Sequence, residues 1–346
     1  MSKTLQNYAT LINDTIQSNE INHYITTDNM CQNLGGIDTF KNINIPQGKV
    51  RSFQKDDILL SNIRLYFRKV YRAKQKGGCS SDVLVFRAKH IDSATLFAIL
   101  SSQIFTDYAC SGSQGSKMPR GNKTHMMDFK IPTINFTIAK IFNSIQNKIE
   151  NNHKINELLH IFAYKIYEYY FKYKPKNAKL EQIIIENPKS SIMVKNAQKT
   201  QDKYPFFTSG DNTLSYPKAI IDGRNCFLNT GGNAGIKFYV GKASYSTDTW
   251  CISANEFSDY LYLLLSSIKT HINQSFFQGT SLKHLQKNLL KKYPIYMPSV
   301  HEIKKFNQII MPLLTLISIN TRTSKKLEQI RDFLLPLLLK QQVKPK

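Results

Sequence analysis

Two segments of the chain carry apolar residues at the spacing of a long helix with one buried face. Steps of three and four residues keep such positions on one side of a helix, and each segment covers about 35 residues, or about 50 Å. The stripe of the first segment is Ile138, Phe142, Ile145 and Ile149, continuing at Leu159, Phe162, Ile166 and Tyr169. The stripe of the second is Phe306, Ile310, Leu313 and Ile317, continuing at Leu327, Ile330, Leu334 and Leu337.

These two predicted helices most economically bury their stripes against each other. A stripe of this length exceeds what one small domain covers, so we expect the helices to pair as a coiled coil, with Asn152 and Asn320 both on its seam. The long connection between them allows either orientation, and we expect the antiparallel one. The alternative is two unrelated helices, each packed on its own domain.

Short apolar runs between polar turns predict strands in the rest of the chain. In the first half these are residues 57–60 and 83–86, together with the alternating stretch Ile63–Tyr66. In the second half they are residues 219–221, 226–228 and 237–240, with turns at Asp222-Gly223 and Gly231-Gly232.

Three weak sequence matches share one spacing and reveal an internal repeat. Ser80–Val83 matches Ser246–Thr249, and Leu100–Ser102 matches Leu265–Ser267 at nearly the same separation along the chain. Phe129–Pro132 likewise matches Ile295–Pro298. The predicted fold class is therefore α+β, with two related, mostly-β modules separated by the long helices. We expect a first module at 1–132, a first helix at 133–175, a second module at 176–298 and a second helix at 299–346.

Charge adds a partner to this picture. The chain has 47 Lys and Arg against 24 Asp and Glu, a formal net charge of +23, which favours nucleic acid as a partner and, behind it, a membrane surface. The first residues lack the apolar core of a signal peptide, and no apolar run of membrane-spanning length occurs, so we expect a soluble protein of the cytoplasm. Five scattered cysteines without a CxxC pair predict reduced thiols and no zinc site.

Catalytic motifs are missing from the sequence. The segment Gly231–Lys237 has glycines but not the spacing of a phosphate-binding loop, and it is better explained as a hairpin turn. No GxGxxG follows a strand, and no Asn-Pro-Pro-aromatic tetrad of an amino-methyltransferase occurs. We expect neither intrinsic catalysis nor a metal site.

Basic side chains interleaved with aromatic ones are the recurring feature. The run Arg64–Lys76 contains no acid and could neutralise phosphates, unless it is a solvated basic face. The Gly-rich loop Ser111–Lys123 offers amides and an arginine that can pair with adenine and guanine, unless it contacts only phosphate or nothing. The second half has a matching Gln278-Gly279 loop. The predicted DNA-binding residues are Arg64, Tyr66, Arg68, Lys69, Arg72, Lys74, Gln114, Ser116, Lys117, Arg120, Asn122, Lys123, Asn233, Lys237, Lys242, Gln278, Thr280, Lys283 and His284.

At this point the sequence resembles the DNA-specificity (S) subunits of type I restriction-modification systems. Residues 55–64 look like the family's "GDIL-x-S-x-I-R" strand, although Lys55-Asp56 stands where Lys-Gly is common. Order and spacing carry the rest of the resemblance. The other segments are 79–86, Gln114-Gly115 leading to Pro132, 204–210, 220–223, 246–248, and the helix segments 154–158 and 324–328.

The resemblance implies a noncatalytic adaptor. Each module would be a target recognition domain reading one half of a bipartite, asymmetric DNA target, and the helices would be a spacer. The implied partners are two adenine-N6 methyltransferase subunits and ATP-dependent translocase-nuclease subunits. S-adenosylmethionine, and ATP with Mg²⁺ in a full restriction complex, would be bound by those partners, and the chain itself would hold no cofactor.

Three alternatives stay open. The chain is shorter than is usual for the family, which leaves a specificity subunit of a related combined restriction-methylation system. A nucleic-acid-processing enzyme with an unrecognised site is a second alternative. A scaffold whose coiled coil is its whole purpose is the third.

Overall fold

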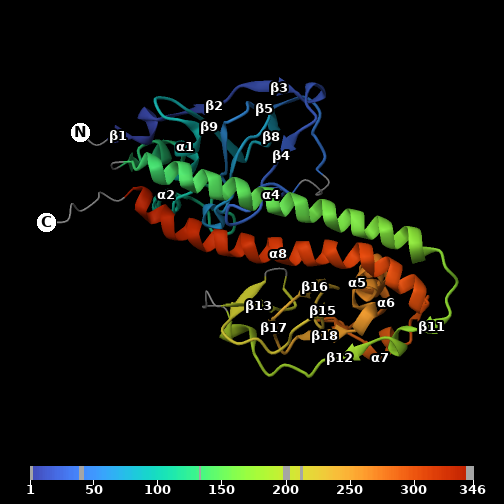
Figure 1. The fold of residues 1–346 in the computed structure, drawn as a ribbon. Helices are drawn as coiled ribbons and strands as arrows, with labels where there is room; N and C mark the ends of the chain where they lie inside the picture. The colour runs from blue at the N-terminus through green and yellow to red at the C-terminus, as the bar shows by residue number, and fades with distance from the viewer. Residues whose placement is uncertain (1–2, 39–42, 132–133, 198–202, 211–212, 340–346) are drawn as a thin grey trace. The chain divides into compact units, whose positions relative to one another are not determined.

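The computed structural model describes residues 3–38, 43–131, 134–197, 203–210 and 213–339 (Figure 1). The chain divides into two compact units. Unit 1 comprises Met1–Asn151 and Ser324–Lys346, and unit 2 comprises Asn152–Thr323. Unit 1 is therefore built from two separate stretches of sequence, whereas unit 2 is continuous. The boundary predicted between residues 132 and 133 lies outside the described residues.

Unit 1 contains short strands followed by three helices. The strands are β1 Lys3–Thr4, β2 Ala9–Ile12, β3 Thr15–Gln17, β4 Tyr24–Ile25, β5 Lys49–Phe53, β6 Ile58–Ser61, β7 Val70–Arg72, β8 Gly77–Cys79, β9 Val83–Ala88 and β10 Lys130–Ile131. The helices are α1 Ser93–Leu100, α2 Gln103–Ser111 and α3 Lys123–Met127.

Unit 2 has a similar order of elements, with two further strands, β19 and β20, between its second and third helices. Its strands are β11 Ala178–Lys179, β12 Ile185–Glu186, β13 Tyr204–Phe207, β14 Leu214–Tyr216, β15 Arg224–Asn229, β16 Ile236–Val240, β17 Ser244–Tyr245, β18 Thr249–Ser253, β19 Phe277–Gln278, β20 His284–Leu285 and β21 Pro294–Ile295. Its helices are α5 Ser258–Ser267, α6 Lys269–Ser275 and α7 Lys287–Lys291.

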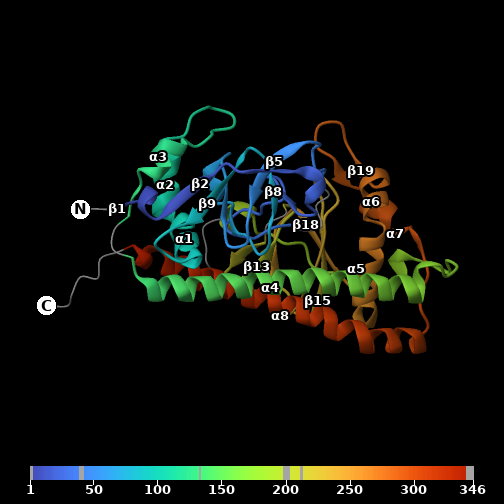
Figure 2. The same cartoon turned by 90° about the horizontal axis from the view of Figure 1, so that it is seen from above.

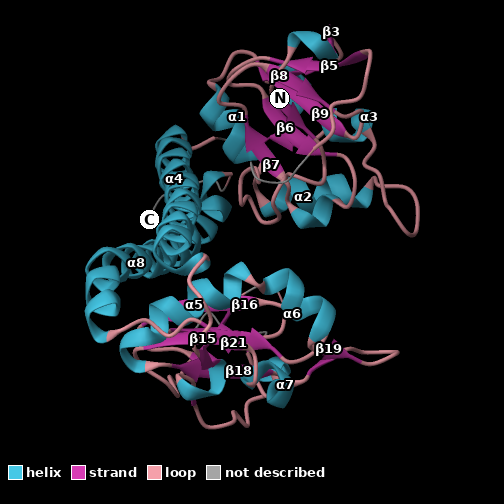
Figure 3. Cartoon of the chain, turned by 90° about the vertical axis from the view of Figure 1, so that its right-hand side faces the viewer, coloured by secondary structure: helices cyan, strands magenta, loops and turns pink. Residues whose placement is uncertain are grey.

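The main sheets of the two units have the same strand order. It is β2-β9-β6-β7 in unit 1 and β12-β18-β15-β16 in unit 2, with antiparallel pairing throughout. Helix α1 packs on β6 and β7, and α5 packs on the equivalent β15 and β16 (Figure 3). The second sheets differ, because unit 1 has four strands, β3-β5-β8-β4, where unit 2 has three, β14-β13-β17.

Two long helices each contribute to both units. Helix α4, Phe136–Tyr167, continues as a π-helical segment over Glu168–Lys172, and α8 spans Val300–Leu338 without interruption. In unit 1 the backbone N–H of Asn135 donates to Leu338 O at 3.1 Å, and Arg331 Nη1 donates to Gln146 Oε1 at 3.0 Å. Rising numbers in one helix meet falling numbers in the other, so the pair is antiparallel within this unit.

The helix pair in unit 2 is antiparallel as well. Asn320 Nδ2 donates to Asn156 Oδ1 at 3.0 Å, and the rings of Tyr170 and Phe306 lie 6.0 Å apart. Asn320 is thus paired with Asn156, one helical turn from Asn152, which is itself buried. The predicted α+β class, with two pseudo-repeated mostly-β domains and long antiparallel helices, is confirmed.

Two predicted strands are wrong. Residues 63–66 form a turn into a 3₁₀ helix at Leu65–Phe67, because Arg64 and Arg68 both have left-handed backbone conformations that end a strand. Residues 219–221 form a loop that is linked to the sheet by backbone hydrogen bonds of Ile220 and Ile221 with Ala243. Short alternating runs of this kind resemble strands in sequence, and only tertiary context separates the two.

The buried stripes are also displaced by one residue in parts of both helices. In α4 the buried positions after residue 160 are Ala163 and Tyr167, whereas Phe162 is exposed and Tyr169 is 86% exposed in the segment that follows. In α8 the buried positions after residue 330 are Arg331, Leu335 and Leu338, and Ile330 is exposed. A straight helix drifts against a seven-residue repeat, so a stripe extended from one end of such a helix loses register.

Candidate nucleic-acid interface

Each unit carries one projecting hairpin, at the position where the Gly-rich loops were predicted. In unit 1, Gln114 and Arg120 exchange backbone hydrogen bonds of 2.9 and 2.8 Å and leave residues 115–119 as the tip. In unit 2, Gln278 pairs with His284 in the β19–β20 hairpin and leaves residues 279–283. Figure 2 shows the loop between α2 and α3, and the loop beside β19, each extending from its own unit.

Backbone hydrogen bonds anchor the unit 1 hairpin to the turn after β6. Arg64 N donates to Pro119 O at 2.9 Å, and Gly121 N donates to Asn62 O at 3.2 Å. Arg64 adopts a φ of 51° in this turn, a left-handed conformation that is uncommon for a residue with a side chain.

The unit 2 hairpin is anchored by the equivalent pair of bonds to the turn after β15. Gly232 N donates to Lys283 O at 2.9 Å, and Leu285 N donates to Thr230 O at 3.0 Å. Gly232 has a φ of 82°, so the left-handed position that Arg64 fills in unit 1 is filled here by the residue best suited to it. The predicted Gly231-Gly232 turn is confirmed.

The side chains of both hairpins are exposed to solvent. Among the described residues, Lys117, Lys123 and Lys283 have no ion-pair partner, and no acid lies between Ser111 and Met127 or between Phe276 and Met297. Arg120 is held by Asp82, with Nη2 to Oδ1 at 3.1 Å, and Asn122 accepts from His125 N as the cap of α3. The hairpins are thus basic surfaces held on ordered anchors. The exposed predicted site residues here are Gln114, Ser116, Lys117, Arg120, Asn122, Lys123, Gln278, Thr280, Lys283 and His284.

The basic run Arg64–Lys76 is arranged differently, because most of its charges meet partners inside unit 1. Lys74 Nζ lies 3.3 Å from Glu150 Oε2 and donates to Asn147 Oδ1 on α4. Lys69 Nζ donates to Thr27 O, and Arg72 lies 3.5 Å from Asp56. Tyr66 is exposed.

Arg68 and Arg64 complete this inward pattern. Arg68 Nη2 donates to Ser101 O at 3.0 Å. Burial lowers the pKa of its guanidinium, and the charges of Asp332 and Asp107 partly offset this lowering. Arg64 Nη2 donates to Lys117 O at 3.2 Å and so braces the hairpin from below. The geometry of this run favours a structural role, and its assignment to DNA contact remains a prediction.

Known proteins resemble this chain in both sequence and fold. Residues 176–329 match the family model "Type I restriction modification DNA specificity domain". The S subunit of a type I restriction-modification system from M. genitalium shares the fold, with a TM-score of 0.66, 14% identity, and coverage of 99% of this chain and 96% of that one. The HsdS subunit from Thermoanaerobacter tengcongensis, at 12% identity and coverage of 98% and 96%, superposes with a TM-score of 0.37. No curated protein matches the chain.

Residues 176–329 are thus similar to type I DNA specificity domains. The predicted resemblance to the specificity subunits is thereby confirmed. Subunits of this family recognise DNA and are noncatalytic, so the prediction of a specificity subunit rather than an enzyme is confirmed by the family. The family works in complexes with methyltransferase and restriction subunits.

The specificity domain also holds the three remaining predicted site residues. Lys237 Nζ donates to Thr208 O and Gly210 O, each at 2.7 Å, and so fixes that loop. Asn233 is exposed beside the hairpin anchor, and its carbonyl accepts from Asn229 Nδ2. Lys242 lies in a concavity on the second sheet.

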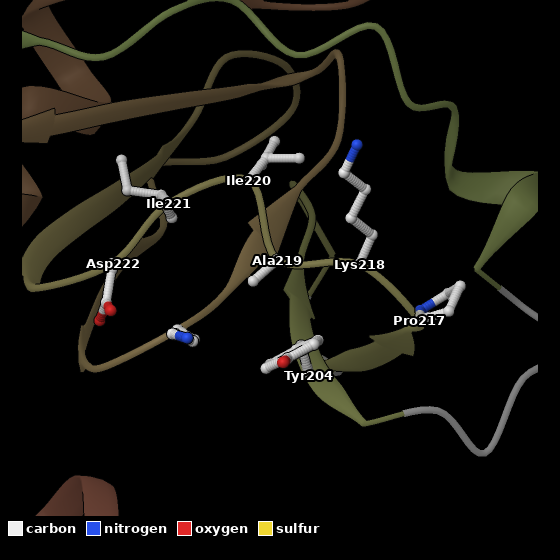
Figure 4. A pocket seen from close by; sticks show the side chains of 8 residues that line it. Tyr204, Pro217, Lys218, Ala219, Ile220, Ile221 and Asp222 are labelled. Carbon is white, nitrogen blue, oxygen red and sulfur yellow. The ribbon is translucent and has the colours of Figure 1, made fainter.

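That concavity has a volume of about 510 Å³ and an open mouth (Figure 4). Tyr204, Lys218 and Asp222 line it together with Lys242 and the apolar segment Ala219–Ile221. Figure 4 shows Lys218 and Ile220 on one side of the loop and the carboxylate of Asp222 on the other. The lysine ammonium groups donate hydrogen bonds, the Asp222 carboxylate accepts them, and the apolar side chains offer contact surface, which together complement the acceptors, donors and thymine methyl group of base edges.

Sequence reasoning missed several exposed residues of both regions. Met118 and Leu282, at the hairpin tips, are 53% and 57% exposed, and Lys218, Asp222 and Tyr204 line the concavity. The matching Gln-Gly pairs contained the signal for the first two, since aligning the loops on them brings Met118 opposite Leu282.

The described part of the chain contains neither a metal-binding cluster nor a membrane span. Its residues hold no group of His, Cys, Asp and Glu that could bind a metal ion. Among the same residues, no helix is both long enough and apolar enough to cross a bilayer.

Proposed function

We propose that the chain is the sequence-reading subunit for a bipartite, asymmetric DNA target, and that it directs adenine methyltransferase and restriction subunits to that target in the cytoplasm. The observation that carries this proposal is the repeat: two units with the same main-sheet order and the same hairpin anchors occur on one chain. The family model covers only 176–329, and the shared topology supports the same role for unit 1. Their different second sheets support two different half-sites.

Affinity in this proposal comes from phosphate neutralisation. The net charge of +23 and the unpaired hairpin lysines fit a polyanion whose counterions are released on binding. The long helices support the role of a spacer and of a docking face for two methyltransferase subunits, since apolar residues such as Leu158, Phe162 and Phe333 remain exposed along them. S-adenosylmethionine, ATP and Mg²⁺ belong to those partners.

The test is to express the chain with its methyltransferase partner and sequence the methylome of the host. We expect N6-methyladenine at one bipartite motif with two different halves. A contiguous or palindromic motif, or methylation that does not depend on the chain, would contradict the proposal.

Charge-removal variants test which basic residues contact DNA. We expect Lys117→Ala and Lys283→Ala each to lower the slope of log affinity against log salt by about 1, because each removes one phosphate contact. Lys74→Ala is the matched control, since its ammonium is engaged by Glu150 and Asn147, and it should leave the slope unchanged. The measurement is a salt titration of DNA binding by fluorescence anisotropy. A larger effect from Lys74→Ala would restore the basic run Arg64–Lys76 as the interface.

A further inference from the structure

The two hairpin tips have the same length and match in residue type at several aligned positions. Alignment on their paired ends brings Gln114 opposite Gln278 and Gly115 opposite Gly279, and both glycines have positive φ, at 101° and 137°. The next positions are hydroxyl residues, Ser116 and Thr280. Each tip then carries one large apolar residue on its surface, Met118 or Leu282.

When a basic hairpin binds DNA, an exposed apolar side chain at its tip can be buried only against an apolar part of the DNA. Met118 and Leu282 are more than half exposed, and the residues around them are hydroxyl, amide and basic groups without an acid. Phosphates offer no apolar surface for the thioether of Met118 or the isobutyl group of Leu282. Stacked bases do, and proteins commonly insert Met or Leu as a wedge between base steps of the minor groove.

Equivalence also says what the tips do not do. Two domains that read different half-sites must differ where they read bases. These hairpins are alike in length, in anchors and in the order glycine, hydroxyl residue, apolar residue, although the lysine precedes Met118 in one and follows Leu282 in the other. The second sheets do differ, in strand number among the described residues and in the groups lining their surfaces, such as Ile220 and Asp222 in unit 2 against Asn13 and Ser81 in unit 1.

We propose that the two hairpins are matched, sequence-independent DNA wedges, in which Met118 and Leu282 insert between base steps while the neighbouring hydroxyl and lysine groups contact phosphate. Choice of sequence then lies with the second sheets. The inference rests on the proposed function only in its premise that the two half-sites differ.

The wedge is tested with the full chain and short duplexes of random sequence that carry 2-aminopurine, a base whose fluorescence rises when it unstacks. Wild-type protein should raise the fluorescence, and Met118→Ala with Leu282→Ala should abolish the rise and weaken binding about tenfold. Ile104→Ala with Ile185→Ala is the matched control, since these side chains are 45% and 43% exposed outside the hairpins. The control should behave as wild type.

Three outcomes would overturn the proposal. One is a wedge variant that keeps both the affinity and the fluorescence rise. Another is a variant that binds DNA normally but no longer assembles with the methyltransferase, which would make the tips partner contacts. The third is an altered methylation motif, which would make them base readers.

The random duplexes keep this test separate from that of the proposed function. If wild-type protein unstacks them but no bipartite motif is methylated, the proposed function fails and the wedge stands. If the motif is methylated and no unstacking occurs, the wedge fails alone.

Discussion

The two units solve the same structural problems with different residues. The turn that anchors each hairpin needs a left-handed residue, which is Arg64 in unit 1 and Gly232 in unit 2. Each unit has a buried Asp paired with an Arg, but from different elements: Arg87 of β9 pairs with Asp57 in unit 1, and Arg224 of β15 pairs with Asp259 of α5 in unit 2. The helix pairs are joined by Gln146 with Arg331 in one unit and by Asn156 with Asn320 in the other. Backbone geometry is what the repeat preserves, while the side chains that stabilise it have diverged.

The buried ion pairs give the sharpest test of that difference. Arg224→Ala should lower the free energy of unfolding by about 3–5 kcal/mol, because it leaves Asp259 buried without its partner and also removes bonds to Thr315 Oγ1 and Met311 O on α8. Arg87→Ala should cost only about 2–3 kcal/mol, since Arg87 is one-third exposed.

Urea unfolding followed by circular dichroism measures both variants, and the fluorescence of Trp250, the single tryptophan, reports separately on unit 2. Replacing both partners, Arg224→Met with Asp259→Leu, should restore most of the stability. Equal losses for Arg224→Ala and Arg87→Ala would show that the contacts to α8 contribute nothing.

The hairpin turn tests the second difference. Gly232→Ala should destabilise unit 2 by about 1 kcal/mol, because a Cβ there meets no atom within 4 Å and the whole cost is the left-handed backbone. Gly210→Ala is the control, since Gly210 is not left-handed and its nearest neighbour would be Thr208 Oγ1 at 3.4 Å. The shift of the Trp250 unfolding transition is the measurement. If Gly210→Ala costs as much, backbone handedness is not the cause.

Substitutions at the N-terminal caps of the long helices should have the smallest effect on stability, and at α8 this effect should depend on pH. Ser299 and Glu302 form a capping box at α8, and hydrogen bonds from the Ser299 backbone and then the Tyr296 hydroxyl lower the pKa of Glu302 to about 2 from 4.5. A lowered folded pKa contributes stability above about pH 4.5 that is lost as the pH falls toward 2. Glu302→Gln should therefore cost about 0.5–1 kcal/mol at neutral pH and progressively less in acid.

Helix α4 supplies the control for this effect. Asn135 caps it by accepting from Ile138 N at 3.2 Å, and no carboxylate stands at the position equivalent to Glu302. Asn135→Ala should therefore cost about 1 kcal/mol with no comparable change between pH 4.5 and 2. Parallel pH profiles for Glu302→Gln and Asn135→Ala would contradict the role of the carboxylate.

Periodicity and repetition were enough to predict the larger features of this fold. Long helices, the internal repeat, and strands at 57–60, 83–86, 226–228 and 237–240 all follow from patterns that are visible along the chain itself. The buried face of the helices could not be predicted in full from the sequence. Arg331, for example, is expected on the surface because it is charged, and only its hydrogen bond to Gln146 explains its burial. Asn320 was correctly placed on the seam, but its partner Asn156 lies on the other long helix, far away in sequence.

The candidate interface was predicted unevenly for a similar physical reason. Loops marked by glycine and lysine stayed exposed, as their composition indicates. The basic run 64–76 has a similar composition, yet Lys74 and Arg68 turn toward α4 and α8, and no local pattern encodes which acids or carbonyls will meet a given cation. Tyr204 and Lys218 join Lys242 in one concavity only through the folding of three separate segments.

The discontinuous makeup of unit 1 sets an order for its assembly during translation. Its core includes Leu335 and Leu338, and Gln146 finds Arg331 only when residues near the end of α8 have been made. Unit 2 is encoded without interruption between residues 152 and 323, so every contact it needs exists before unit 1 has received its last segment. Domains generally fold in the order of their synthesis, but here unit 1 cannot be completed until unit 2 has been synthesised. The part of the protein that is synthesised first is the part that is completed last.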